Sequence, residues 1–178
     1  MKRLFKKIWA VSMIIALMCP MTVVASPKGR KMLDQKSEES VLLPITTKYS
    51  VGQESVVGRS KALASAMCMI TNTEKGIIHI YAETAMFIPV DWAALTIYLE
   101  KLNESTNKWA VVETFEKEFT PADKEDGQLT SVELSIDVGT QPVGYYYRLR
   151  CIHELEYDNG WYEAKSTKTD GVLLTNIK

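Results

Sequence analysis

The strongest constraint on the fold is a two-residue alternation of apolar and polar side chains that recurs through the C-terminal two thirds of the chain. It is clearest in the segment 129–138, where Val132, Leu134, Ile136 and Val138 alternate with Ser131, Glu133, Ser135 and Asp137. Successive side chains of a β-strand point to opposite faces, so this pattern predicts a strand with one buried and one solvated face. No stretch after residue 60 shows the period of an α-helix.

Seven other segments are rich in β-branched and aromatic residues and are separated by turn residues at fairly regular intervals. They are residues 62–71, 77–84, 93–102, 109–119, 145–155, 161–168 and 172–177. The turn Asp158-Asn159-Gly160 is typical of a tight hairpin, because Asn and Gly tolerate positive φ angles. Short strands spaced in this way predict an all-β protein, an antiparallel β-sandwich of about seven or eight strands.

The N-terminus has the parts of a bacterial secretory signal peptide. Four basic residues lie within the first seven positions, an apolar run covers residues 8–18, and Ala25 precedes Ser26. The run is shorter than the roughly 20 residues that span a bilayer. We therefore expect cleavage after Ala25, a secreted, extracellular chain and no stable membrane anchor after cleavage. Cys19 does not fit a lipidation motif, because Met18 stands where a small residue is needed.

Two more regions follow residues 1–25. Residues 26–60 are rich in Lys, Glu, Ser and Gln, and their one apolar cluster is Val41-Leu42-Leu43. Such a composition buries too little to offset the entropy of ordering, so we expect a polar flexible leader. Whether residues 41–47 add a strand stays open. Residues 61–178 are predicted to form the sandwich domain.

The charge of the chain bears on its partners. The four basic residues of the signal peptide leave 17 Lys and Arg against 22 Asp and Glu in the remaining chain, a net charge of −5. An acidic domain has no electrostatic reason to bind nucleic acid or anionic lipid. We expect the partner to be a protein or a glycan of unknown identity.

The residue types that carry chemistry do not form a recognisable motif, so no catalytic, cofactor or metal site is predicted. His79 and His153 are expected to face opposite ways, and neither has a cysteine or carboxylate at ligand spacing. No serine or cysteine is spaced with them as in a nucleophilic triad. Six carboxylates leave a small paired-acid hydrolase as an alternative to a solvated acidic face. They are Glu113, Glu116, Glu118, Asp123, Glu125 and Asp126.

Two basic residues, Arg148 and Arg150, are expected on the solvent face of their strand. We expect them to pair with carboxylates on a neighbouring strand rather than to bind phosphate. Two cysteines, Cys68 and Cys151, are expected on core faces. In an exported chain they could form a disulfide between the sheets, or they could remain two buried free thiols, and the sequence leaves both alternatives open.

The best candidate for a binding surface is the sandwich end that carries the loop 157–162. Tyr157, Trp161 and Tyr162 offer large, rigid contact area of the kind enriched at interaction hot spots, and His153 could add a polar contact. The alternative is that Trp161 and Tyr162 merely begin a strand, one pointing inward and one outward.

The segment 138–151 contains a Gly- and Pro-bearing loop, then Tyr145-Tyr146-Tyr147, then alternating Arg148, Leu149, Arg150 and Cys151. It resembles the corner and sixth strand of fibronectin type III domains, which are immunoglobulin-like sandwiches. The resemblance implies that Tyr145 is the tyrosine-corner residue, whose hydroxyl bonds back to the preceding connection. The chain departs from that family on the second strand, where Ala82 falls in place of tryptophan.

A second resemblance covers residues 58–174. It is carried by Cys68-Met69-Ile70-Thr71-Asn72, Gly76-Ile77-Ile78-His79-Ile80, Thr96-Ile97-Tyr98-Leu99-Glu100, the run from Gly144 to Arg150, and His153. These segments resemble an uncharacterised secreted family of Gram-positive anaerobes of the Clostridia type, known as a domain of unknown function. The resemblance implies export and a sandwich fold. We therefore expect a secreted, non-catalytic interaction or surface module. The alternatives are a secreted antagonist (a toxin or an inhibitor) and a small carboxylate-dependent hydrolase.

Overall fold

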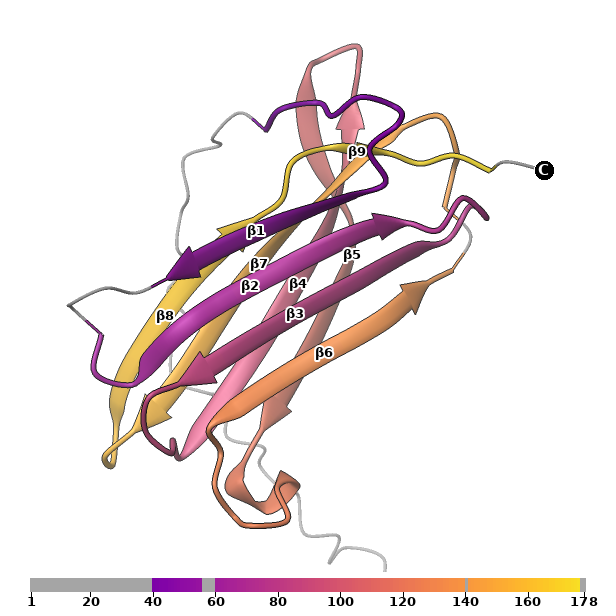
Figure 1. Cartoon of the computed structure of the whole chain (residues 1–178). Helices are drawn as coiled ribbons and strands as arrows, with labels where there is room; N and C mark the ends of the chain where they lie inside the picture. The colour runs from indigo at the N-terminus through magenta and orange to yellow at the C-terminus, as the bar shows by residue number, and fades with distance from the viewer. Residues whose placement is uncertain (1–39, 56–59, 140, 177–178) are drawn as a thin grey trace, which may run out of the picture. The chain divides into compact units, whose positions relative to one another are not determined.

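The computed structural model describes residues 40–55, 60–139 and 141–176. The predicted signal peptide and the first part of the predicted leader lie outside these ranges. The described residues form nine strands in two antiparallel sheets packed face to face, with no α-helix (Figure 1). They accordingly include no helix that is long and apolar enough to cross a membrane. The predicted antiparallel β-sandwich is confirmed.

The first sheet has the strand order β1-β2-β3-β6. Its strands are β1 (Tyr49–Ser55), β2 (Leu63–Asn72), β3 (Ile78–Met86) and β6 (Ser131–Val138). The second sheet has the order β5-β4-β7-β8, and the short β9 pairs with the start of β7. Its strands are β4 (Trp92–Asn103), β5 (Lys108–Phe119), β7 (Tyr146–Tyr157), β8 (Trp161–Lys168) and β9 (Val172–Leu173). A single 3-10 turn, Pro121–Asp123, interrupts the β5–β6 connection within the described ranges.

All eight predicted strands are present, and their ends agree within two residues except that β9 stops at Leu173. The alternation on β6 has the predicted sense. Val132 and Val138 are buried, Leu134 and Ile136 are partly buried, and the four polar residues between them are exposed. The two-residue period therefore identified the core face correctly.

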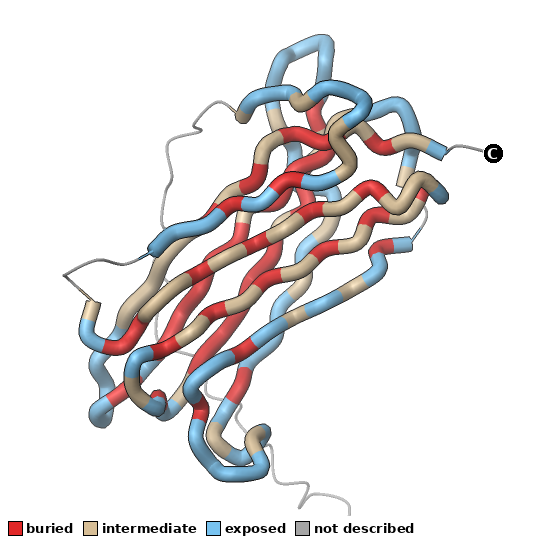
Figure 2. The backbone as a smooth tube through the Cα atoms, in the orientation of Figure 1, coloured by how far each residue is buried: buried red, intermediate tan, exposed pale blue. Residues whose placement is uncertain are grey.

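The core lies between the sheets and is built from the inward rows of both. Ile70, Ile78 and Ile80 enter it from the first sheet, and Leu95 and Ile97 enter it from the second. Figure 2 shows the result as buried positions that recur at every second residue along β2 and β3. Burying a side chain of this size stabilises the fold by about 1.5–3 kcal/mol relative to its exposure, so this row is the main source of stability.

The prediction of a flexible leader up to residue 60 is wrong for residues 40–55. β1 pairs with β2 along its whole length, from Tyr49 opposite Thr71 to Ser55 opposite Ser65. Before it, Leu42 forms a single parallel bridge with Gly171. Backbone pairing with the edge of an existing sheet needs few apolar side chains, so composition did not reveal this strand. The chain thus pairs with the sandwich from the Leu42 bridge onward, and residues 41–47 contribute one bridge rather than a strand.

The assignment of Tyr145 as the corner tyrosine is also wrong. Tyr145 lies before β7, is 41% exposed, and its ring centroid is 4.6 Å from Nζ of Lys101. Tyr147 is fully buried, and its hydroxyl donates a hydrogen bond of 2.8 Å to the carbonyl of Pro142. Gly144, with φ of 83°, turns the chain just before β7. Tyr145 lies in this turn, so Tyr147, the next residue of the same parity, is the one whose hydroxyl reaches back to the loop. Burial raises the pKa of Tyr147 to about 12.

We expect Tyr147→Phe to lower the free energy of unfolding by about 1–2 kcal/mol, because the shape is kept while the Pro142 carbonyl loses its donor. Tyr145→Phe is the matched control and should change the free energy by less than about 0.5 kcal/mol, since its exposed hydroxyl keeps water in both states. Urea unfolding of both variants measures the difference. Equal losses from the two substitutions would show that the Tyr147 hydrogen bond does not hold the corner.

Candidate functional site

The β3–β4 connection and the β7–β8 turn lie at the same end of the sandwich (Figure 1), and exposed aromatic side chains lie in or beside both. Phe87 is 63% exposed, Trp161 is 63% exposed and Tyr162 is 51% exposed. The chain just before β2 lies between them: the Phe87 N–H donates to the Ala62 carbonyl at 2.7 Å, and Nζ of Lys61 lies 5.4 Å from the Trp161 ring centroid. We refer to Lys61, Phe87, Trp161 and Tyr162 as the aromatic end.

Two connections of the aromatic end are tied to each other. The predicted hairpin is confirmed: β7 ends at Tyr157, β8 begins at Trp161, and the intervening Asp158, Asn159 and Gly160 all have positive φ. The Asn159 N–H donates to Oδ2 of Asp91 at 3.3 Å. The Asp91 N–H in turn donates to the carbonyl of Glu156 at 2.8 Å. These bonds hold the β3–β4 connection against the hairpin.

Glu163 on β8 fixes the third connection. Its carboxylate accepts hydrogen bonds from the hydroxyls of Ser60 and Tyr157 and from the N–H groups of Lys61 and Leu63. Burial by itself would raise the pKa of Glu163, but these hydrogen bonds outweigh it and hold the pKa at about 2. The carboxylate is therefore ionised at physiological pH. By binding Ser60, Lys61 and Leu63 it also holds Lys61 beside the Trp161 ring.

The structure brings together only half of the binding surface predicted from the sequence. Trp161 and Tyr162 are both exposed, which decides against the alternative that one of them points inward, but Tyr157 is 4% exposed and His153 is fully buried. Both of these side chains share the inward parity of Cys151 and therefore belong to the core. The ring nitrogens of His153 lie 2.8 Å from the hydroxyls of Thr84 and Thr167. Burial lowers the pKa of His153 to about 4, so the ring is neutral at physiological pH.

Sequence reasoning missed Phe87 and Lys61. Phe87 follows the predicted strand 77–84 in a connection, where a large apolar side chain has no strand partner to cover it. Its place in a connection was the only feature of the sequence that indicated an exposed Phe87. Lys61 gave no signal at all, because its proximity to Trp161 depends on the pairing of strands far apart in the sequence.

The two arginines on β7 both pair with the carboxylate of Glu100 instead of forming a phosphate site. Arg148 lies opposite Glu100 in the β4–β7 register, and its Nε donates to Oε2 at 2.7 Å. Arg150 donates to the other oxygen of Glu100 at 3.2 Å. The expected cross-strand pairing is confirmed, but the expected solvent exposure is not: Arg148 is 4% exposed, and the ring of Trp109 lies 4.4 Å from its guanidinium carbon.

The six carboxylates of the alternative hydrolase have separate surroundings. Glu116 and Glu118 are exposed on β5 with the adjacent Lys117, and Glu113 accepts a hydrogen bond from the side chain of Gln141. Asp123 caps the 3-10 turn, because the Thr120 N–H and hydroxyl both donate to it, and these bonds lower its pKa. Glu125 and Asp126 are exposed in the same connection. No group of three or more His, Cys, Asp or Glu side chains in the described ranges could hold a metal ion.

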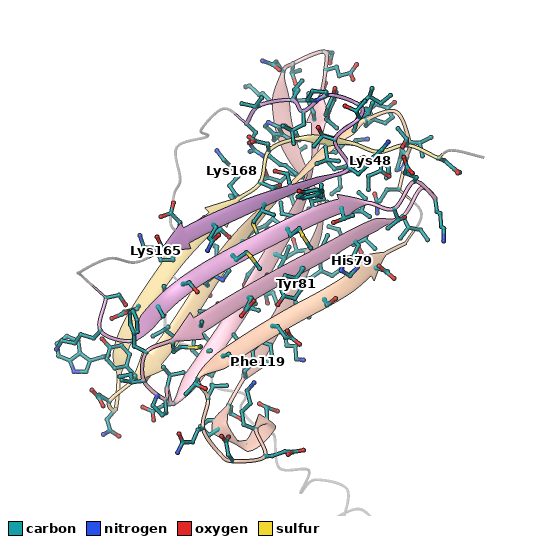
Figure 3. All side chains as sticks on the ribbon, viewed as in Figure 1. Lys48, His79, Tyr81, Phe119, Lys165 and Lys168 are labelled. Atoms are coloured by element: carbon teal, nitrogen blue, oxygen red, sulfur yellow. The ribbon has the colours of Figure 1, made fainter. Side chains whose placement is uncertain are left out.

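The structure places a serine, a histidine and an aspartate in series on the outer face of the first sheet, where Figure 3 shows His79 on β3. Oγ of Ser135 lies 3.5 Å from Nε2 of His79, whose Nδ1 lies 2.7 Å from Oδ1 of Asp137. The sequence did not reveal this because it depends on the pairing of β3 with β6. In serine hydrolases the aspartate is buried, whereas the Asp137 side chain is 72% exposed and solvated.

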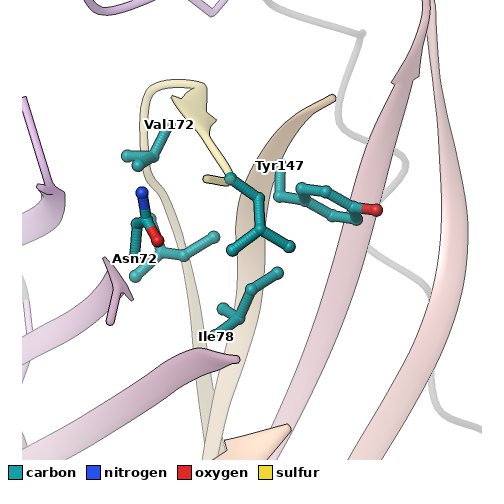
Figure 4. Close-up of a pocket in the computed structure, with 6 residues that line it drawn as sticks. Asn72, Ile78, Tyr147 and Val172 are labelled. Atoms are coloured by element: carbon teal, nitrogen blue, oxygen red, sulfur yellow. The ribbon is translucent and has the colours of Figure 1, made fainter. Parts of the chain in front are cut away.

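One narrow gap among the described residues lies beside the tyrosine corner and is lined by Ile70, Asn72, Ile78, Tyr147, Val172 and Leu174 (Figure 4). It has no room even for a water molecule. It is therefore too small to take a ligand.

Cys68 and Cys151 are free thiols in the structure, and both are fully buried. Cys68 lies on β2 of the first sheet and Cys151 on β7 of the second. Both side chains point into the core, as predicted.

No protein-family model, no curated protein and no solved structure matches the chain. Its class therefore follows from its own geometry. It is an antiparallel β-sandwich with Phe87, Trp161 and Tyr162 exposed at one end.

Proposed function

We propose that the chain is a secreted, non-catalytic interaction module that binds a protein or a glycan through the aromatic end. The observation that carries this proposal is the exposure of Phe87, Trp161 and Tyr162, each more than half exposed at one end of the sandwich. Tyrosine and tryptophan dominate the binding energy of many interfaces.

The hydrogen bonds beneath the aromatic end support the same proposal. Asp91 holds the hairpin, and Glu163 holds the residues before β2. A surface whose loops are fixed before binding loses less conformational entropy when the partner arrives. The aromatic end is thus organised as a binding surface in the free protein.

The strand order supports a fibronectin-type-III-like assignment as part of the proposal. With β1 and β9 set aside, β2-β3-β6 form one sheet and β5-β4-β7-β8 form the other. The chain then runs through strands A, B, C, C′, E, F and G in order, and Tyr147 supplies the corner of strand F. The β3–β4 and β7–β8 connections correspond to the B–C and F–G loops, which carry the binding residues of immunoglobulin variable domains.

Two further elements of the proposal come from the sequence. The signal peptide at residues 1–25 supports export. The resemblance to the secreted family of Gram-positive anaerobes agrees with export and with a sandwich.

A binding screen tests the proposal. The chain from Ser26 is applied to a glycan array and to an array of extracellular proteins, and its affinity for each ligand found is compared with that of Trp161→Ala and Phe87→Ala. We expect both substitutions to weaken binding at least about ten-fold, which corresponds to about 1.4 kcal/mol. Tyr49→Ala is the control, since Tyr49 is 60% exposed on β1, outside the aromatic end.

Two results would contradict the proposal. The first is an affinity that falls equally for Tyr49→Ala and Trp161→Ala, or for neither. The second is covalent labelling of Ser135 by a fluorophosphonate probe, abolished by His79→Ala, because it would show that the Ser135–His79–Asp137 series is a working nucleophile.

A further inference from the structure

The two sheets approach each other closely beside Cys68 and Cys151. Gly52 lies opposite Cys68 in the β1–β2 register, and Cys151 lies opposite Thr167 in the β7–β8 register. A Cβ atom on Gly52 would fall 2.2 Å from the carbonyl oxygen of Lys168, the residue after Thr167. The backbones of β1 and β8 are therefore in contact at the level of the two cysteines.

This approach removes the usual obstacle to a bond between sheets. Packed sheets ordinarily lie about 10 Å apart, whereas a disulfide needs Cα atoms about 4.4–6.8 Å apart. Here the Cys68 and Cys151 thiols are close enough to affect each other's protonation, and the Thr167 side chain adjoins both. They lie on opposite walls of the core and point toward one another.

We propose that Cys68 and Cys151 form a disulfide that joins the two sheets once the chain folds outside the cell. The oxidant is a disulfide of a thiol oxidoreductase or of a small thiol compound. The thiolate of one cysteine attacks a sulfur of this disulfide and releases one thiolate. The second cysteine, deprotonated, then attacks the mixed disulfide and releases the other. The chain loses two electrons and two protons, and the oxidant becomes two thiols.

The burial of both thiols determines when the bond forms. Neither side chain is accessible in the folded chain. An external oxidant cannot reach a buried sulfur, and exchange requires direct attack by a thiolate on the oxidant. The exchange therefore occurs before the sheets close, and the completed fold protects the product. The proposal depends on export for its oxidant and is independent of the partner bound at the aromatic end.

Refolding tests the proposal. The chain from Ser26 is unfolded and reduced, then refolded either with a mixture of reduced and oxidised glutathione or with a reductant alone. We expect the first product to be two hydrogen atoms lighter and to contain no titratable thiol after denaturation. Closing so long a loop should raise its melting temperature above that of the reduced product by an amount on the order of 10 °C.

Two controls separate the bond from other effects of the redox buffer. The double variant Cys68→Ala/Cys151→Ala should melt at the same temperature in both buffers. Folded, reduced chain placed in the glutathione mixture should keep its thiols far longer than the chain that refolds in it. The proposal is overturned if oxidative refolding leaves two free thiols or stable glutathione adducts, or if the bonded product melts no higher than the reduced one.

Discussion

Glu100→Gln is expected to lower the free energy of unfolding by about 3–5 kcal/mol. The side chains of Glu100 and Arg148 are 7% and 5% exposed, and a single carboxylate serves both Arg148 and Arg150. The amide keeps the shape of the glutamate but removes its charge, so Arg148 and Arg150 both lose the carboxylate to which their Nε atoms donate. Breaking one partner of a buried ion pair is costly for this reason, even where the intact pair adds little stability.

The control for this substitution is Glu104→Gln, in the exposed turn between β4 and β5. It should change the free energy of unfolding by less than about 0.5 kcal/mol. Urea or thermal unfolding measures both variants, and far-UV circular dichroism checks that each one folds. If Glu100→Gln were as mild as Glu104→Gln, the arginines would have to be satisfied by other groups, and the ion pair would not organise this face of β7.

Gly52→Ala is expected to cost at least about 3 kcal/mol, which is the upper range for forcing extra atoms into a packed interior. The added methyl group would lie 2.2 Å from the oxygen and 2.4 Å from the carbon of the Lys168 carbonyl. These are backbone atoms held in β8, so they cannot rotate away as a side chain could. Relief requires β1 to move off β8, which also disturbs the pairing of β1 with β2.

Gly139→Ala provides the comparison, because a Cβ at Gly139 meets nothing within 4 Å and the residue has no positive φ. That substitution should be neutral or should stabilise by up to about 1 kcal/mol through the lower entropy of the unfolded chain. Chemical unfolding of both variants gives the difference. A Gly52→Ala variant as stable as the wild type would mean that β1 does not rest on β8 and that the two sheets do not meet beside the cysteines.

The sequence by itself determined the strands between residues 62 and 173, their inward faces and the hairpin at Asp158-Asn159-Gly160. These features are local: alternation reports the two faces of one strand, and the turn residues report the φ angles that they tolerate. Cys68 and Cys151 could be assigned to the core for the same reason. The sequence left open whether Trp161 and Tyr162 are both exposed, and the structure shows that both are.

Only the tertiary structure decided which strands cover which side chains. β1 has little apolar content and is held by its pairing with β2. Phe87 meets Ala62, and Lys61 meets Trp161, only because remote connections come together at one end. Arg148 alternates like a solvated residue but is buried beside Glu100 and Trp109. A two-residue period gives the direction of a side chain and carries no information about what is packed above it. The corner role of Tyr147, the surface at the aromatic end and the meeting of the two cysteines therefore depend on contacts between strands distant in the sequence.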